Sequence, residues 1–319
     1  MTAMATTSDN AARRAFWARQ MDEAYAFMQR VRQQPVHECS EPMRSLVEAV
    51  RAAGVEVAFS SKRHVLGLPR LYFLREGLVA PFLAAAREMV TRGWVMRVED
   101  GFRTRDMQRQ LALQPYTFDI IRERVRWELD GQPLTAQLVL RRMSALVANA
   151  PEVGTHMAGS AIDISVLDRD SGEEIERGGA YLELWELTPM NSPFVSAAAQ
   201  ANREAITALM ARHGFVAYPW EFWHYSRGDA YETILQGLDQ PARYGPVDVD
   251  LATGRVQSIL APLEQLNSDR SLKFLSENEI GRVNWRNDQN APVDPRIGKR
   301  RARSAALSAR GAGAGPQPG

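Results

Sequence analysis

The stretch GTHMAGSAIDIS, residues 154–165, contains one histidine and one aspartate, with glycines on both sides of the histidine. His156 and Asp163 are seven residues apart, and the pattern of this segment predicts no single helix that spans both. Gly154 and Gly159, however, allow a loop to fold so that the strand that follows carries Asp163 beside His156. The stretch therefore predicts that an imidazole and a carboxylate meet at one place in the fold.

A further histidine stands in the stretch WEFWHY, residues 220–225. Glu221 and His224 would lie on opposite faces of a regular strand, so we expect a turn or bulge between them. A catalytic zinc takes three protein ligands from His, Asp, Glu or Cys and leaves a fourth position for water. His156, Asp163 and His224 form such a set, with Glu221 as a carboxylate beside the third ligand. No HExxH stretch occurs, which excludes the helical scaffold of thermolysin-like peptidases.

The rest of the chain alternates between amphipathic segments and short apolar runs. Helical spacing of apolar residues and the glycines that close these segments predict helices. Period-two alternation and aromatic enrichment predict strands. The predicted helices cover 11–32, 42–53, 78–92, two or three segments within 106–149, and 196–213. The predicted strands cover 55–60, 94–100, a segment beginning near Ala161, and the aromatic run after Gly214. This order indicates an α+β fold with a small sheet backed by helices and a helical N-terminal region.

The composition is that of an ordinary globular protein. The 319 residues are 45% hydrophobic and 24% charged, and the net charge is +1, which provides no field to attract nucleic acid. The single cysteine, Cys39, is compatible with a reducing compartment. We find neither an apolar run long enough to cross a membrane nor the apolar core of an export signal. These features predict a cytoplasmic protein that does not insert into membranes, and they leave its oligomeric state open.

Three motifs in this order resemble one peptidase family. THMAGSAID and EFWHY, preceded by EDGFRT, resemble the zinc D-Ala-D-Ala dipeptidases and carboxypeptidases of the VanX and VanY type, peptidase family M15. The resemblance spans about Trp94 to Ser226 and implies a hedgehog/D,D-peptidase-like fold with a mainly antiparallel sheet. It also implies the site residues and the cofactor, which is one zinc ion. The implied ligands are His156, Asp163 and His224, the implied base is Glu221, and the implied arginine near the scissile carbonyl is Arg103.

Two departures from the family pattern bear on the substrate. Gly154, with Thr155 beside it, stands where the family has a serine two positions before the first ligand, so the substrate contact of that hydroxyl does not carry over to this chain. The helical segment between Arg103 and His156 is placed to wall the site or to change what fits.

The resemblance implies hydrolysis of D-alanyl-D-alanine or a related cell-wall dipeptide by metal-activated water. A D,D-carboxypeptidase that trims D-Ala from muropeptides is one alternative. The other is a zinc-stabilised binding module without turnover, as in the hedgehog signalling domain. The expected partner is a small peptide with D-amino acids, and Glu221 favours an enzyme because a structural metal needs no base.

The domain organisation and the remaining histidines complete these predictions. Residues 1–93 are expected to form a mostly helical region on the core, 94–285 the catalytic domain with a C-terminal extension, and 286–319 a disordered tail rich in Gly, Ala and Arg. His213 is predicted to end a helix, and His37 and His64 to lie on the surface or in loops, outside the site.

Overall fold

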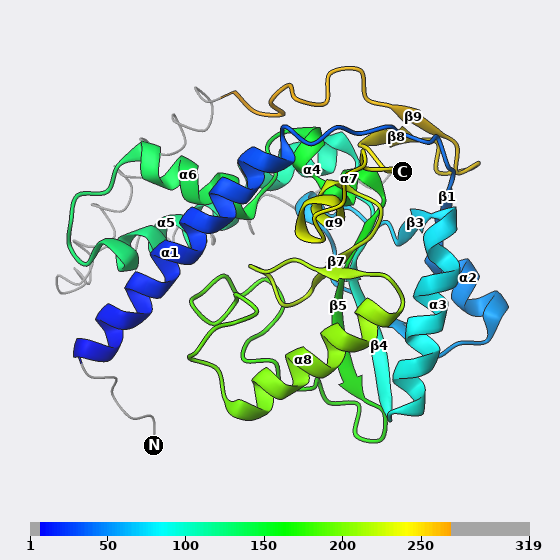
Figure 1. The fold of residues 1–319 in the computed structure, drawn as a ribbon, viewed down its shortest axis with the longest axis horizontal. Helices are drawn as coiled ribbons and strands as arrows, with labels where there is room; N and C mark the ends of the chain where they lie inside the picture. Colours follow the sequence, from blue (N-terminus) through cyan, green and yellow to red (C-terminus); the bar gives the residue numbers. More distant parts are fainter. Residues whose placement is uncertain (1–6, 269–319) are drawn as a thin grey trace, which may run out of the picture. The chain divides into compact units, whose positions relative to one another are not determined.

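The computed structural model describes residues 7–268 (Figure 1). The predicted tail, 286–319, and the last part of the predicted catalytic domain lie outside the described residues. The domain boundaries at 93 and 285 stay predictions. No helix within residues 7–268 is long and apolar enough to cross a membrane.

A five-stranded sheet lies at the centre of the fold, in the order β2-β4-β5-β7-β6. The pair β2 and β4 is parallel, whereas the other three pairs are antiparallel, which confirms the predicted mainly antiparallel sheet. Two small two-stranded sheets, β1-β3 and β8-β9, flank it. The strands of the central sheet are β2 (Val57–Phe59), β4 (Trp94–Asp100), β5 (Ala161–Asp168), β6 (Val216–Ala217) and β7 (His224–Ser226). The flanking strands are β1 (Met43–Ser45), β3 (Phe73–Arg75), β8 (Val247–Val249) and β9 (Val256–Ser258).

Helices surround this sheet. Figure 1 shows α2 and α3 to the right of the sheet and α1, α5 and α6 to its left. The longer helices are α1 (Thr7–Val31), α3 (Glu76–Thr91), α5 (Pro115–Leu129), α6 (Ala136–Leu146) and α8 (Ala197–Arg212). The shorter ones are α2 (Leu46–Ala53), α4 (Arg105–Leu113), α7 (Thr155–Ala158) and α9 (Ala230–Leu235), with 3-10 turns at Val65–Gly67 and Pro151–Val153. The predicted helices at the N-terminus, before the first long strand and before the last motif are confirmed.

One face of the sheet is covered by α3 and α8. Because side chains alternate along a strand, Ile162 and Ile164 of β5 point into this core, while Asp163 points to the other face. Phe82 of α3 and Leu209 of α8 are fully buried in the same cluster. The sheet is thus apolar on one side and carries its polar residues on the other.

A second core forms where α1 packs against α6 and α9. The apolar residues that the N-terminal pattern predicted to share one face are all buried. Those residues are Phe16, Met21, Ala24, Met28 and Val31. Trp220, from the segment that leads into β7, packs in the same cluster. The N-terminal helix therefore supports the chain directly before the last predicted ligand.

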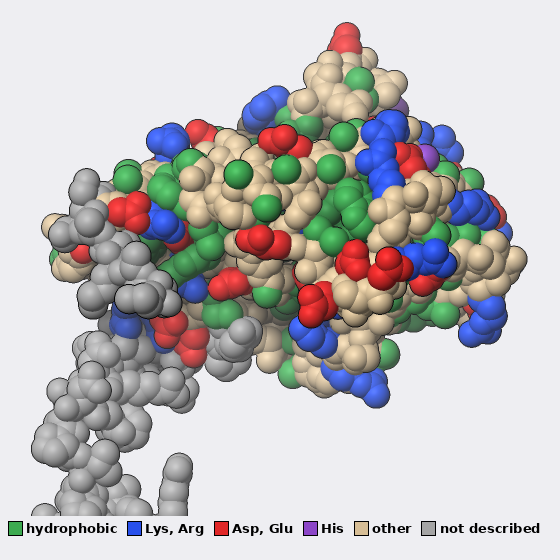
Figure 2. Space-filling model, turned by 90° about the horizontal axis from the view of Figure 1, so that it is seen from below, with side chains coloured by type: hydrophobic (Ala, Val, Ile, Leu, Met, Phe, Trp, Pro, Cys, Tyr) green, Lys and Arg blue, Asp and Glu red, His purple; other side chains and the backbone are tan. Residues whose placement is uncertain are grey.

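The surface matches the balanced composition. Figure 2 shows acidic and basic side chains interspersed over the face seen from below, among the residues that the structure describes. This distribution agrees with the net charge of +1. The face provides no extended field of one sign.

Candidate metal centre

Three neighbouring strands present a row of polar residues on the face away from α3 and α8. Asp163 of β5 pairs directly with His224 of β7 on one side and with Asp100 of β4 on the other. Regular alternation would place Asp100 on the same face as Val98, which lies in the core. A register shift between these two residues turns Asp100 to the polar face instead.

His156 reaches the same place from α7, a single helical turn. Gly159 ends this turn with φ 66°, and a Cβ there would overlap the side chain of Met43. His156 Nδ1 lies 2.7 Å from the carbonyl oxygen of Gly101, to which it donates. This bond leaves Nε2 as the nitrogen that faces Asp163. The loop with two glycines that the sequence predicted is therefore a one-turn helix closed by one of them.

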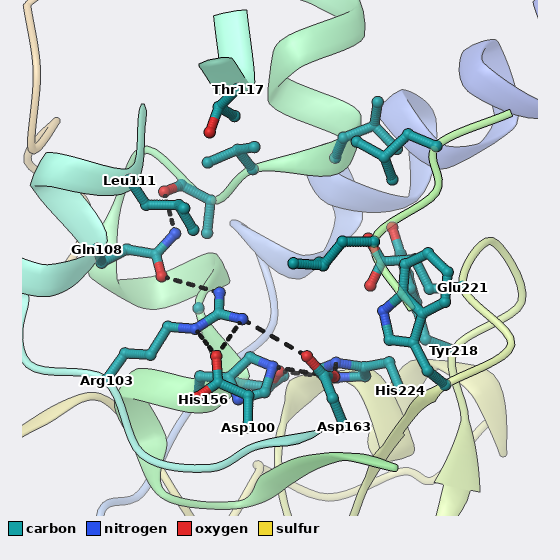
Figure 3. Close-up of a pocket in the computed structure, with 18 of the residues that line it drawn as sticks. Asp100, Arg103, Gln108, Leu111, Thr117, His156, Asp163, Tyr218, Glu221 and His224 are labelled. Atoms are coloured by element: carbon teal, nitrogen blue, oxygen red, sulfur yellow. Dashed lines mark hydrogen bonds and ion pairs between the residues drawn. The ribbon is translucent and has the colours of Figure 1, made fainter. Parts of the chain in front are cut away.

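The two imidazoles converge on one oxygen of Asp163 (Figure 3). Asp163 Oδ1 lies 3.0 Å from His224 Nδ1 and 3.3 Å from His156 Nε2. The ligand atoms of the three residues lie within 4.8 Å of one another, and all three side chains are buried. His224 Nε2 is 3.0 Å from the hydroxyl of Thr155, so each ring holds one nitrogen against an oxygen and turns the other to the carboxylate. Two imidazoles and one carboxylate arranged in this way fit a catalytic zinc site.

Arg103 binds to the edge of this cluster through Asp100. Its Nε and Nη2 lie 2.9 Å from Asp100 Oδ2, and Nη2 is 3.5 Å from Asp163 Oδ2. Burial alone would raise the pKa of Asp100, but Arg103 and His64 lower it below its usual range. Burial likewise opposes ionisation of Asp163, yet the neighbouring imidazoles hold its pKa well below the ordinary value. Both carboxylates are therefore charged in the folded chain.

Glu221 lies in a turn directly before β7. The backbone N–H of His224 donates to the carbonyl of Glu221 over 3.2 Å, which confirms the predicted turn between them. Burial, the largest effect, raises the pKa of Glu221 to about 7, the charge of Asp163 adds to it, and His224 opposes it. A carboxyl with this pKa can take up and release a proton near neutral pH.

All five predicted site residues line one cavity of about 360 Å³. Its floor is the polar row, and its opposite wall comes from the helical segment between Arg103 and His156. Figure 3 shows Leu111 and Thr117 on that wall, across from Asp163. Ile120, Leu146 and Val147 belong to the same segment, whereas Leu182 and Leu184 line the cavity from the connection between β5 and α8. The cavity is thus charged on one side and largely aliphatic on the other.

His64 lies in a loop, as predicted, but the prediction that it stays outside the site was wrong. His64 is only 8% exposed, lines the cavity, and places Nε2 3.5 Å from Asp100 Oδ2. It reaches this position because its loop folds back, with the hydroxyl of Tyr72 donating to the carbonyl of Ser60 over 2.5 Å. In contrast, His37 is exposed, and His213 ends α8 with Nε2 2.8 Å from Glu88, as the sequence predicted.

Sequence reasoning also missed Asp100, Arg70 and Tyr181. Arg70 Nη1 lies 3.0 Å from Asp100 Oδ2, and the hydroxyl of Tyr181 lies 2.9 Å from Asp163 Oδ2. Asp100 stood within the EDGFRT motif at a strand end, which was a usable signal. Nothing in the local pattern around Arg70 or Tyr181 marks either residue.

Comparison with known proteins identifies relatives of this chain. A family model described as D-ala-D-ala dipeptidase, Peptidase_M15, matches residues 79–244. The D-alanyl-D-alanine dipeptidase of Synechocystis is 25% identical over 219 residues, which are 61% of this chain and 85% of that protein. The Escherichia coli D-alanyl-D-alanine dipeptidase is 36% identical over 70 residues, which are 22% of this chain and 36% of that protein. The crystal structure of the D,D-pentapeptidase VanY with Zn(II) aligns with a TM-score of 0.32 and 15% identity, covering 64% of this chain and 93% of that one.

Proposed function

Because the chain belongs to the M15 family of D-Ala-D-Ala dipeptidases, a family of zinc metallopeptidases, we propose that it hydrolyses D-alanyl-D-alanine or a closely related cell-wall dipeptide. One observation carries the proposal: a buried cluster of two histidines and one aspartate shares a cavity with a glutamate whose pKa is raised to about 7. This is the pairing of metal ligands and proton acceptor that metal-assisted hydrolysis needs.

The metal would be held by His156, Asp163 and His224. Zinc bound there would act as a Lewis acid, which would lower the pKa of a bound water and polarise the carbonyl of the substrate. The hydrogen bonds of His156 to Gly101 and of His224 to Thr155 keep each ring in one orientation. The protein thus contributes a preformed set of ligand atoms.

Glu221 moves the proton in this proposal. Its carboxylate accepts a proton from the attacking water and returns it to the amine that leaves. Burial raises the pKa of Glu221, which makes its carboxylate a stronger base than an exposed one.

Arg103 stabilises the oxyanion that develops on the scissile carbonyl. Asp100 holds the guanidinium by Nε and Nη2, which leaves Nη1, 3.4 Å from Gln108 Oε1, as the group on the cavity side. A donor that is fixed before the reaction does not have to reorganise during it.

The size of the cavity favours a dipeptide over a longer peptide as the substrate. A volume of about 360 Å³ is near the lower end of small-molecule sites, and the helical wall faces the ligands across it. The binding-module alternative is disfavoured because a structural zinc is closed by a fourth side chain. Among the described residues, the cluster offers three.

The test is release of D-alanine from D-Ala-D-Ala and, in parallel, from a muropeptide that ends in D-Ala-D-Ala. We expect chelator-sensitive cleavage of the free dipeptide and little cleavage of the muropeptide. Efficient cleavage of the muropeptide would identify a D,D-carboxypeptidase instead. Zinc binding without cleavage of either substrate would contradict the proposal.

A further inference from the structure

The two oxygens of Asp163 have different partners. Oδ1 faces both imidazoles, at 3.0 and 3.3 Å. Oδ2 points the other way and accepts a hydrogen bond of 2.9 Å from the hydroxyl of Tyr181. The one cation close to Oδ2 within the described residues is Arg103, whose Nη2 lies 3.5 Å away, at the limit of a hydrogen bond. Tyr181 therefore makes the well-formed hydrogen bond to this oxygen.

Tyr181 belongs to the long connection between β5 and α8, and its ring is fixed on two sides. It meets Trp223 edge to face, with ring centroids 5.6 Å apart, and the guanidinium of Arg70 lies 5.9 Å from its ring centre. Trp223 directly precedes the third ligand. The hydroxyl therefore points at Asp163 from the connection between β5 and α8, which lines the cavity outside the sheet.

Two buried arginines hold this connection in place. Arg203 of α8 donates to the carbonyl oxygens of Arg177, Leu187 and Pro189, over 2.6, 2.7 and 2.8 Å. Arg177 donates to the carbonyl oxygens of Ile164 in β5 and Phe222, over 2.8 and 3.1 Å. Both arginines are 1% exposed, so they give up solvation to bind the backbone of these segments.

The backbone conformation of the connection is also specific. Gly178 has φ 84°, and a Cβ there would overlap the side chain of Val195. Leu182, directly after Tyr181, has φ 66°, a conformation that costs a non-glycine residue about 1 kcal/mol or more. Strain of this kind persists only where the surrounding contacts impose it, and it is frequent where a side chain is aimed at a functional site.

We propose that Tyr181 is a positioning residue for the metal centre, which holds Oδ2 of Asp163 so that Oδ1 alone is presented to zinc. The inference rests on the proposed function, since it concerns the same ligand set. A carboxylate free to rotate would present either oxygen or both, and fixing it beforehand removes that freedom before the metal binds. Removal of a hydrogen-bond partner of a metal ligand commonly lowers metal affinity or activity by about 10- to 100-fold.

The variant Tyr181→Phe removes this one hydroxyl and keeps the ring against Trp223. Tyr225→Phe is the matched control. Tyr225 is 1% exposed, and its hydroxyl lies 3.0 Å from Thr207 Oγ1. It lies in the core on the other face of the sheet. Both variants lose one hydroxyl with one hydrogen-bond partner, but only the first loses a contact with a ligand.

The measurement is the zinc dissociation constant of the full chain, by competition with a chelating dye, for wild type and both variants. We expect Tyr181→Phe to bind zinc about 10- to 100-fold more weakly and Tyr225→Phe to bind it like the wild type. Equal constants for Tyr181→Phe and wild type would overturn this inference and leave the proposed function intact. Equal weakening in both variants would also overturn it, because the effect would be general. A wild-type chain that binds no zinc would overturn the proposed function as well.

Discussion

Asp100 and Asp163 lie directly opposite each other on neighbouring strands, and Nη2 of Arg103 lies 2.9 Å from one carboxylate and 3.5 Å from the other. Like charges at directly opposed positions destabilise a sheet unless a cation compensates them. Arg103 compensates both, so the same guanidinium that the proposal assigns to the oxyanion also offsets the repulsion between these two carboxylates. This relationship makes the effect of changing Asp100 informative.

Asp100→Asn should reduce kcat without removing zinc. The amide keeps the shape of the side chain but loses the charge that orients Arg103, so we expect kcat to fall by up to about 100-fold, approaching the loss of an oxyanion donor. Asp248→Asn is the control, because Asp248 forms a comparable pair with Arg105 at the exposed surface. Unchanged kcat in Asp100→Asn would contradict the role of Arg103.

Glu221→Gln should nearly abolish turnover. Loss of general base catalysis typically costs about 10² to 10⁴-fold, and the amide cannot accept the proton. Zinc content measured by elemental analysis should equal that of the wild type, because Glu221 is not in the ligand set. Glu152→Gln provides a control: burial also raises the pKa of Glu152, yet this residue lies outside the cavity lining. Retention of most activity in Glu221→Gln would rule out its assigned role.

Removal of the metal should lower the melting temperature. A ligand present at about 100 times its dissociation constant stabilises the folded state by about 2.7 kcal/mol, which corresponds to roughly 5–10 °C for a domain of this size. Calorimetry with and without a chelator measures the shift. In His224→Ala the chelator should have almost no effect, and an equal shift there would place the metal elsewhere.

Gly159→Ala should disturb the turn that carries His156. A Cβ at Gly159 would overlap Met43 and would also strain the left-handed backbone. Gly172→Ala measures the backbone strain without any overlap, because Gly172 has φ 71° and no atom lies within 4 Å of the added Cβ. We expect about 1 kcal/mol of destabilisation for Gly172→Ala and a further loss of about 1–3 kcal/mol for Gly159→Ala, by urea unfolding. Only Gly159→Ala should weaken zinc binding.

The loss of stability at acid pH should depend in part on Glu88, a residue that lies away from the metal centre. Side-chain hydrogen bonds from Arg212, and then His213, lower the pKa of Glu88 from an ordinary 4.5 to about 2. Because the folded pKa is the lower one, this contribution to the free energy of unfolding is present above pH 4.5 and is lost as the pH falls towards 2. Glu88→Gln should therefore show a shallower loss of stability over this range in urea unfolding at several pH values. The difference should be modest, since the side chain is 26% exposed and screened by solvent.

Local patterns were sufficient to identify the candidate ligands. His156, Asp163, His224 and Glu221 stand in two short motifs, and their residue types specify a metal site with a base wherever the chain brings them together. The N-terminal helix was equally readable, because Met21, Met28 and Val31 repeat at the helical period and must be buried together.

The partners of these residues were decided by the tertiary structure. Asp100 faces the site only because β4 shifts register against β5, and His64 enters the cavity only because its loop folds back. Tyr181 meets Asp163 only because Arg177 and Arg203 hold the connection that carries it. The sequence determines which groups can bind a metal, since that follows from side-chain chemistry. Which groups orient them depends on contacts between distant segments, and residue type and spacing along the chain do not encode those contacts locally.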